Sequence, residues 1–206
     1  MDGDRLEAFS DGVFAVAITL LALDLVVPEP GHVPLARQLA DNWPSFAAYF
    51  VSFLTVGIIW VNHHTIFKNV SDVDRVLLFL NLLLLFFVAT IPFGTATIAA
   101  YLTHSGADAA LAAALFQVVF LGMSVSFATL FWWTIRHGHL KITLTPDAQR
   151  SALIRFGIGN VAYAAAIGVA FLSAPASLFL SLLVAIYYMF EQTPTRPSDD
   201  ATGGNP

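Results

Sequence analysis

The sequence predicts an all-α integral membrane protein with six transmembrane helices. Of its 206 residues, 57% are hydrophobic and only 11% are charged, and the mean hydropathy is +0.74. Soluble domains average about 25% charged residues, so this chain has too few charges to cover a surface that faces water. Six apolar segments approach or reach the roughly 20 residues that a helix needs to cross a bilayer. No segment has the composition of a soluble domain.

Each segment is bounded by recognisable signals. Pro28 and Pro30 end the first helix, and Pro44 stands at the start of the second, where proline is tolerated. Pro92 falls inside the third segment and predicts a kink or a break there. Pro175 opens the sixth segment, which is short, so the fifth and sixth are expected to form a tight hairpin. The six helices are expected at about 6–27, 45–67, 74–100, 108–135, 151–173 and 176–190.

Two further segments differ from these six. The stretch 31–43 is expected to contain a short interfacial helix. The polar end EQTPTRPSDDATGGNP is rich in Pro and Gly, a composition typical of disorder. We therefore expect a six-helix membrane domain over 1–192 and a disordered tail over 193–206. The acidic start MDGDRLE lacks the basic region of a signal peptide, so the first segment is expected to be a retained helix.

The basic residues predict the orientation of the chain. With six spans, one side of the membrane receives both termini and the second and fourth loops, and eight of the nine Lys and Arg residues fall on that side; Arg37 alone falls on the other. Cytoplasmic loops carry the excess of Lys and Arg, so both termini are expected to be cytoplasmic and the chain to lie in the cell membrane. The formal charge of −5 argues against nucleic-acid binding, which calls for a clustered basic face. The absence of cysteine excludes disulfides and Cys-based metal sites.

The first helix carries one continuous apolar stripe. At about 100° per residue, Leu20 and Leu23 lie within about 40° of Val16 on the helical wheel. Ser10 and Asp11 point away from this stripe, at about 120° and −140°. A carboxylate at this depth is costly unless it is paired within the protein, so Asp11 is expected to hold the first helix against the second and third. The candidate partners near the same end of those helices are Trp60, Asn62, His63, His64 and Asn81.

Three stretches of this sequence resemble a known family. They are Arg5-x-x-x-Phe9-Ser10-Asp11 followed by VFAVAITLLALDL, then WVNHH at 60–64, and the spacing of Asn81 to Pro92-Phe93. Together they resemble the prokaryotic members of the transmembrane protein 175 family, the lysosomal potassium channel-like proteins. The resemblance covers about the first 100 residues, and the last three helices contribute only hydropathy and order.

The resemblance implies a homotetrameric, potassium-preferring cation leak channel with no cofactor, whose pore is lined by the first helix of each subunit. It places the pore constriction on Val16, Leu20 and Leu23. Thr19 and Asp24 are candidate further pore contacts. The alternative for Thr19 is a hydrogen bond to its own helix, and the alternative for Asp24 is a position in the headgroup region. The structural polar network is expected to comprise Arg5, Phe9, Ser10, Asp11, Trp60, Asn62, His63, His64 and Asn81.

Other classes of function fit less well. Ser10 and Asp11 are neighbours on a helix and diverge by about 100°, so a hydrolase triad with a histidine is difficult to assemble. His63 and His64 diverge for the same reason and lack the spacing of a helical metal motif, which favours structural hydrogen bonding. A proton-coupled secondary transporter and a non-conducting membrane scaffold remain as alternatives. A transporter usually shows an internal repeat, and residues 101–190 contain no second RxxxFSD.

Overall fold

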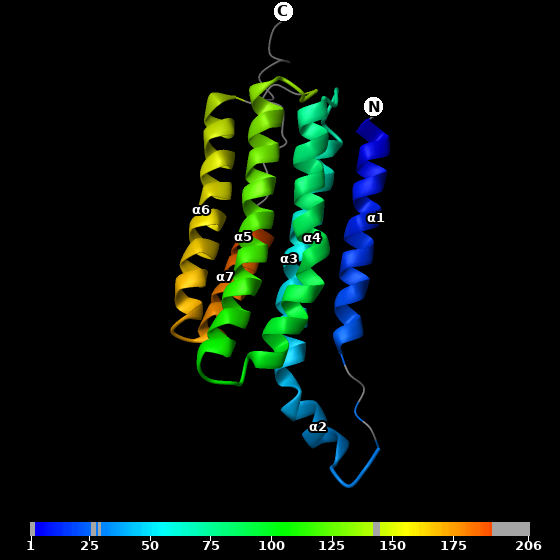
Figure 1. The fold of residues 1–206 in the computed structure, drawn as a ribbon. Helices are drawn as coiled ribbons and strands as arrows, with labels where there is room; N and C mark the ends of the chain where they lie inside the picture. Colours follow the sequence, from blue (N-terminus) through cyan, green and yellow to red (C-terminus); the bar gives the residue numbers. More distant parts are fainter. Residues whose placement is uncertain (1–2, 26–27, 29, 142–144, 191–206) are drawn as a thin grey trace, which may run out of the picture.

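The computed structural model describes residues 3–25, 28, 30–141 and 145–190, and these form helices joined by short turns (Figure 1). The described residues contain no β-strand, only an isolated bridge between Val70 and Leu140. The helices are α1 (Gly3–Leu21), η1 (Ala22–Asp24), α2 (Leu35–Asp41), α3 (Trp43–Phe67), α4 (Arg75–Tyr101), α5 (Ala107–Arg136), α6 (Pro146–Ala170) and α7 (Ala174–Phe190). Five helices are long and apolar enough to cross a membrane, and α7 is a shorter apolar helix. The six predicted helices and the short helix within 31–43 are therefore confirmed, but the first helix ends at Leu21, followed by a 3-10 turn to Asp24, and not at about residue 27 as predicted. The tail predicted over 193–206 lies outside the described residues.

Local signals set most of the helix boundaries. Pro44 and Pro146 lie in the first turns of α3 and α6, where a missing N–H leaves no helical bond unmade. The side chain of Thr145 caps α6 by accepting a hydrogen bond from the backbone N–H of Ala148. Pro92 does not break its helix, because α4 runs continuously from Arg75 to Tyr101. Of the kink or break predicted at this residue, the break does not occur.

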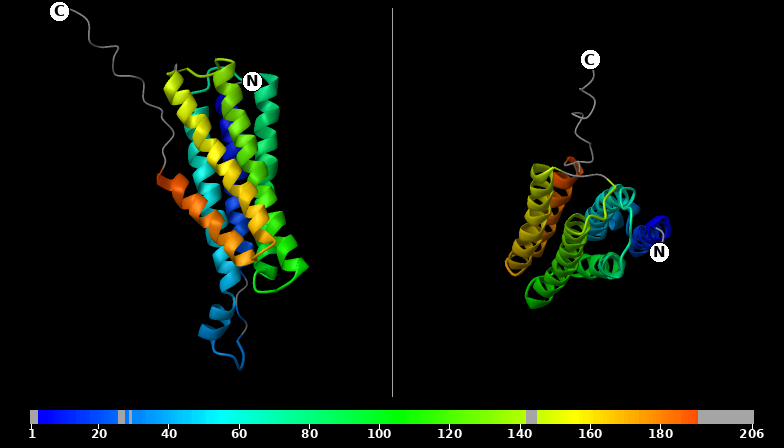
Figure 2. Two further views of the ribbon diagram at one scale, coloured as in Figure 1. Left: turned by 90° about the vertical axis from the view of Figure 1, so that its left-hand side faces the viewer. Right: turned by 90° about the horizontal axis from the view of Figure 1, so that it is seen from above.

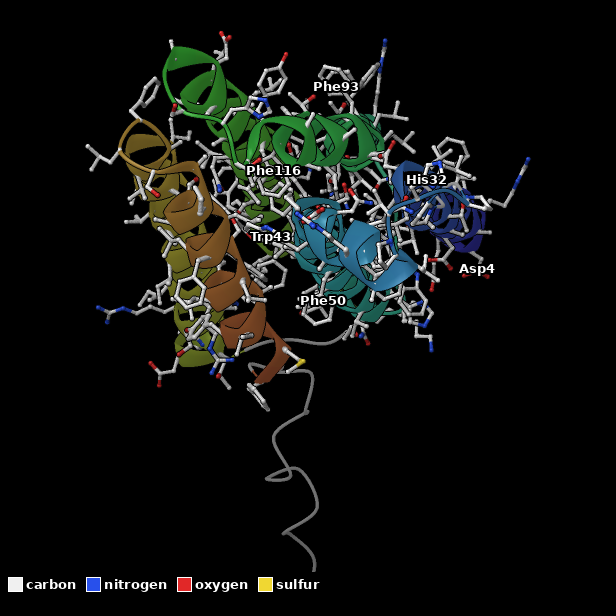
Figure 3. The ribbon with its side chains drawn as sticks, turned by 90° about the horizontal axis from the view of Figure 1, so that it is seen from below. Asp4, His32, Trp43, Phe50, Phe93 and Phe116 are labelled. Atoms are coloured by element: carbon white, nitrogen blue, oxygen red, sulfur yellow. The ribbon has the colours of Figure 1, made fainter. Side chains whose placement is uncertain are left out.

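The helices form a bundle with α1 at one edge and α6 and α7 at the other (Figures 1 and 2). Helix α1 packs against α3 and α4, and α5 packs against α4, α6 and α7. Helix α5 is the most enclosed span. Its Phe116 is fully buried among the neighbouring helices, whereas Phe93 of α4 is exposed at the outside of the bundle (Figure 3). Because α1 has neighbours on one side only, its other side is free to meet something outside the chain.

The two ends of the bundle differ in the number of basic residues that they carry. The amino-terminal end of α1, the α3–α4 connection and the carboxyl end of α5 lie at one end, and α2 lies beyond the other (Figure 1). Arg37 is on α2, at the end opposite the start of α1. Seven of the eight basic residues predicted to share the first end lie on α1, around the α3–α4 and α5–α6 connections, and on the early turns of α6: Arg5, Lys68, Arg75, Arg136, Lys141, Arg150 and Arg155. The eighth, Arg196, is outside the described residues.

Asp74 joins two connections at this basic end. Its carboxylate caps α4 by accepting a hydrogen bond from the backbone N–H of Leu77 at 2.6 Å, and it also accepts one from the indole of Trp133 at 3.1 Å. His139 lies 3.2 Å from the same carboxylate. Partial desolvation by itself would raise the pKa of Asp74, but these hydrogen bonds and the nearby imidazole together lower the pKa below its ordinary value of 3.8. The ionised carboxylate therefore holds the start of α4 against the end of α5.

Candidate functional site

Helix α1 separates its residues into a packed face and an open face. Val16, Leu20 and Leu23 are 57%, 41% and 75% exposed within the single chain. The middle of the packed face lies about 120° from Val16 on the helical wheel, a third of a turn from the open face. The buried residues are Leu6, Ser10, Phe14, Ala17 and Leu21. An apolar helix that keeps large side chains on an open face at the edge of the bundle has a surface available for other copies of the chain, lipid or an ion path.

The carboxyl end of the stripe departs from regular α-helix. Residues 22–24 form a 3-10 helix, which turns about 120° per residue. Leu23 consequently stays on the open face, whereas Asp24 rotates further from Val16 than the α-helical wheel predicts and is half-buried. The exposed Thr19 donates its hydroxyl hydrogen to the carbonyl of Val16 at 2.9 Å, so it bonds to its own helix while still lying on the open face.

The packed face of α1 carries a buried relay of hydrogen bonds. The amide of Asn81 on α4 donates to Ser10 Oγ at 2.9 Å, and Ser10 donates to the carbonyl of Leu6 at 2.8 Å. The other side of the Asn81 amide lies 2.9 Å from Nε2 of His63 on α3, and all three polar side chains are fully buried. Since Asn81 donates to Ser10, its oxygen accepts from a protonated Nε2 of His63. The relay therefore ties α1, α3 and α4 together in the apolar interior.

Asp11 has a separate partner. The indole N–H of Trp60 donates to Asp11 Oδ1 at 2.9 Å, so Trp60 is the candidate residue on α3 that bonds to Asp11. His63 and Asn81 bond instead to each other, and Asn62 donates to the carbonyl of Ile58 in its own helix. The prediction that Asp11 is held within the same chain is supported by this contact.

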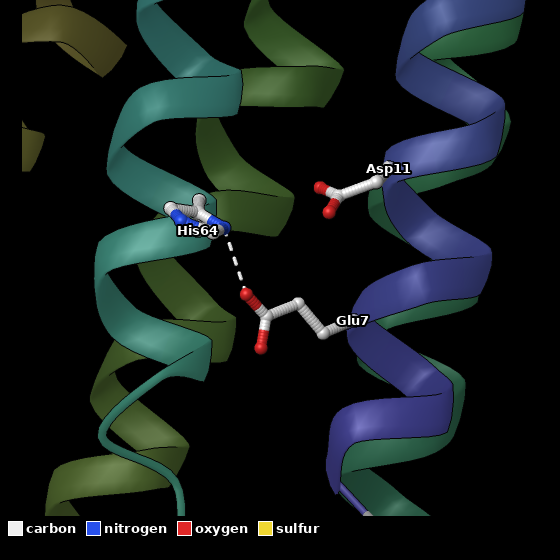
Figure 4. Close-up of side chains that lie close together, drawn as sticks. All are labelled: Glu7, Asp11 and His64. Atoms are coloured by element: carbon white, nitrogen blue, oxygen red, sulfur yellow. Dashed lines mark ion pairs between the residues drawn. The ribbon is translucent and has the colours of Figure 1, made fainter.

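Glu7 joins this network, although it was not among the residues expected there. Its carboxylate lies 2.7 Å from Nδ1 of His64 (Figure 4). The sequence feature that indicates Glu7 as a member is its spacing: Glu7 and Asp11 are four residues apart and so share a face of α1. The structure thus brings together Ser10, Asn81 and His63 in one group, and Glu7, Asp11, Trp60 and His64 in a second. Arg5 and Phe9, also predicted members of the network, lie exposed on α1.

These residues fall in the part of the chain that matches a known family. The sequence profile described as the endosomal/lysosomal potassium channel TMEM175 matches residues 5–92. A potassium channel of Streptomyces collinus is 48% identical over 195 residues, which is 94% of each chain. The endosomal/lysosomal proton channel TMEM175 of Homo sapiens is 36% identical over 153 residues, covering 70% of this chain but 30% of the human protein.

Solved structures agree with this sequence similarity. The crystal structure of a lysosomal potassium-selective channel TMEM175 homolog from Chamaesiphon minutus superposes with a TM-score of 0.78 at 36% identity, covering 91% of this chain and 96% of that one. A variant of the potassium channel MtTMEM175 superposes with a TM-score of 0.61 at 20% identity, covering 89% of this chain and 88% of that one, a level of identity that supports the fold alone.

Proposed function

The chain belongs to the TMEM175 family, and from this premise we propose that it is a homotetrameric, potassium-preferring cation leak channel of the cell membrane. Its relatives are named ion channels, not enzymes. The excess of Lys and Arg that cytoplasmic loops carry supports a cytoplasmic position for the basic end of the bundle.

The open apolar face of α1 is the observation that supports this proposal. A single chain supplies one such face, so an ion path lined by it needs several copies around an axis. Homo-oligomers are mostly closed and symmetric, and four copies would bring Val16, Leu20 and Leu23 together as three rings. These rings would span about 10 Å along the axis at a rise of about 1.5 Å per residue.

Apolar rings can gate a pore by excluding water. Ion flux would then be limited by the width and wetting of the rings, and potassium would pass more readily than sodium because its hydration shell is held less tightly. Thr19 adds a hydroxyl oxygen between the rings of Val16 and Leu20, and Asp24 adds negative charge near their outer end. Thr19 is proposed as a secondary pore contact, whereas Asp24, which the 3-10 helix turns away from the open face, is proposed to act only through its charge at the pore mouth.

The polar contacts of α1 supply the rigidity that such rings need. The buried relay of Ser10, Asn81 and His63 and the bond from Trp60 to Asp11 lie on the packed side of α1. They fix the rotation of α1 about its axis, and that rotation determines which side chains face outward. In this role Asp11 is a structural partner and not an ion ligand.

Flux into liposomes tests the proposal. Purified protein is reconstituted with a potassium gradient, and flux and reversal potential are read in potassium and sodium. Leu20→Asn is expected to wet the constriction, raise the flux severalfold and weaken the preference for potassium, and Leu23→Ala is expected to act in the same direction but less strongly.

Leu111→Asn is the matched control, since Leu111 is 67% exposed but lies on α5. Ala17 is unsuitable as a control because it is buried against the bundle. Parental flux and selectivity in the Leu20 and Leu23 variants, with altered selectivity in Leu111→Asn, would contradict the assignment of the pore face. Flux strictly coupled to protons would favour a transporter instead.

A further inference from the structure

We propose that Glu7, Asp11 and His64 form a binding site for a divalent cation of the zinc class, which links α1 to α3. One ligand atom from each side chain lies within 4.8 Å of the others. Figure 4 shows both carboxylates extending from α1 toward the imidazole of α3. Nothing in the proposed ion path requires this group, because it lies away from the open face of α1.

The three side chains are held in place by their neighbours. Trp60 donates to Oδ1 of Asp11, which orients the carboxylate and leaves its second oxygen available. The ring of Trp60 also stacks on that of His64, with centroids 5.7 Å apart and planes 22° from parallel. Outer contacts of this kind orient metal ligands and tune their affinity.

The arrangement leaves one buried polar atom without a hydrogen bond and places two like charges side by side. Nδ1 of His64 is buried and has no hydrogen-bond partner. It lies 2.7 Å from the Glu7 carboxylate, but the two atoms do not have the alignment of a hydrogen bond. Glu7 and Asp11 are also like charges four residues apart on one helix face, a destabilising spacing. A cation bound to both carboxylates and to Nδ1 would satisfy all three groups.

The ligand chemistry indicates which cation fits. Zinc binds histidine nitrogen at about 2.0–2.1 Å and carboxylate oxygen at about 2.0–2.2 Å in tetrahedral geometry, which separates neighbouring ligand atoms by roughly 3.3 Å. The ligand atoms lie within 4.8 Å of one another, so side-chain movements of at most about 1.5 Å would bring them to that separation. Magnesium and calcium prefer oxygen ligands throughout, so the imidazole favours zinc. Three protein ligands leave a fourth position for water, and the His64 side chain is 32% exposed, which allows entry.

Isothermal titration of zinc into the purified full-length chain in detergent tests the site. One zinc ion per chain is expected to bind and to raise the thermal unfolding temperature, and magnesium is expected to do neither. Glu7→Gln and His64→Gln should each weaken zinc affinity by more than about tenfold. Changes to residues that only support the ligands of a metal site already cost about 10–100-fold in affinity, so loss of a ligand should cost at least as much. Asp108→Asn and His104→Gln should leave the zinc affinity unchanged. Asp108 is an exposed carboxylate in the first turn of α5, and His104 is an exposed imidazole just before that helix.

Equal zinc affinity in the parent, Glu7→Gln and His64→Gln would overturn the proposal. If His64→Gln fails to fold, the near-isosteric Glu7→Gln decides the outcome. The zinc X-ray absorption spectrum of the loaded parent gives a second criterion, since a spectrum without an imidazole contribution would also exclude this site. None of these measurements depends on ion conduction, so their result is separate from that of the flux experiment.

Discussion

Removal of one hydroxyl group from the packed face of α1 should destabilise the whole bundle. Ser10→Ala deletes the atom that accepts the amide hydrogen of Asn81, and water has no access to replace it because both residues are fully buried. An unsatisfied buried donor costs about 1–3 kcal/mol. Hydrogen bonds between helices measured in membranes lie lower, at about 0.6 kcal/mol on average and up to about 1.7. We therefore expect Ser10→Ala to lower the free energy of unfolding by about 1–2 kcal/mol.

Reversible chemical unfolding in detergent micelles, followed by far-UV circular dichroism, measures this change. Thr90→Ala is the control, because it removes from a half-buried residue a hydroxyl that donates to the carbonyl of Phe86 in its own helix, and it should stay within about 0.5 kcal/mol of the parent. Asn81→Leu in the Ser10→Ala background removes the orphaned amide, so the double variant should lose less than the sum of the two single variants, by about 1 kcal/mol. Parental stability of Ser10→Ala, or additive losses in the double variant, would show that the relay does not hold α1.

Three further predictions concern other parts of the chain. Asp74→Ala should lower the free energy of unfolding by about 1 kcal/mol through loss of the helix cap. Because the pKa of Asp74 is lowered on folding, its stabilisation is present above pH 3.8 and disappears as the pH falls further. In a series of thermal unfolding measurements at different pH, Asp74→Asn should therefore show a smaller loss of stability at acid pH than the parent. Gly159→Ala should weaken the packing of α6 on α7 by placing a methyl group about 2.5 Å from the Tyr188 hydroxyl, so its unfolding temperature should fall, whereas Gly157→Ala, which meets open space, should match the parent. Cross-linking and native mass measurement in mild detergent should give a tetramer, and monomers that still conduct ions would exclude a pore built between chains.

The helices were predictable from the sequence because hydropathy and proline placement act locally. Six apolar segments and their ends follow from the residues themselves, and the open and packed faces of α1 follow from its periodicity. Of the kink or break predicted at Pro92, the break did not occur. Proline removes one helical bond and crowds the preceding turn, but neighbouring helices in a bundle can hold the chain helical on both sides.

The partners within the polar network were less predictable. Depth in the membrane placed Trp60, His63, His64 and Asn81 level with Ser10 and Asp11, but the pairing depends on the rotation of α3 and α4, which no local pattern sets. Trp60 was among the expected partners of Asp11, whereas His64 meets Glu7 instead. Glu7 was overlooked because it belongs to an acidic start that has the composition of a solvated flank.

The short last helix has a consequence for the lipid around the protein. Helix α7 contains 17 residues, about 25 Å at 1.5 Å per residue, against a hydrocarbon core of about 30 Å. Its apolar sequence ends at Phe190, which is 76% exposed, and Glu191 and Gln192 follow at once. A span that is too short draws the bilayer thinner beside it. The lipid next to α7 should therefore be thinner than the lipid beside α4, so bilayer thickness itself becomes a variable that acts on one side of the chain.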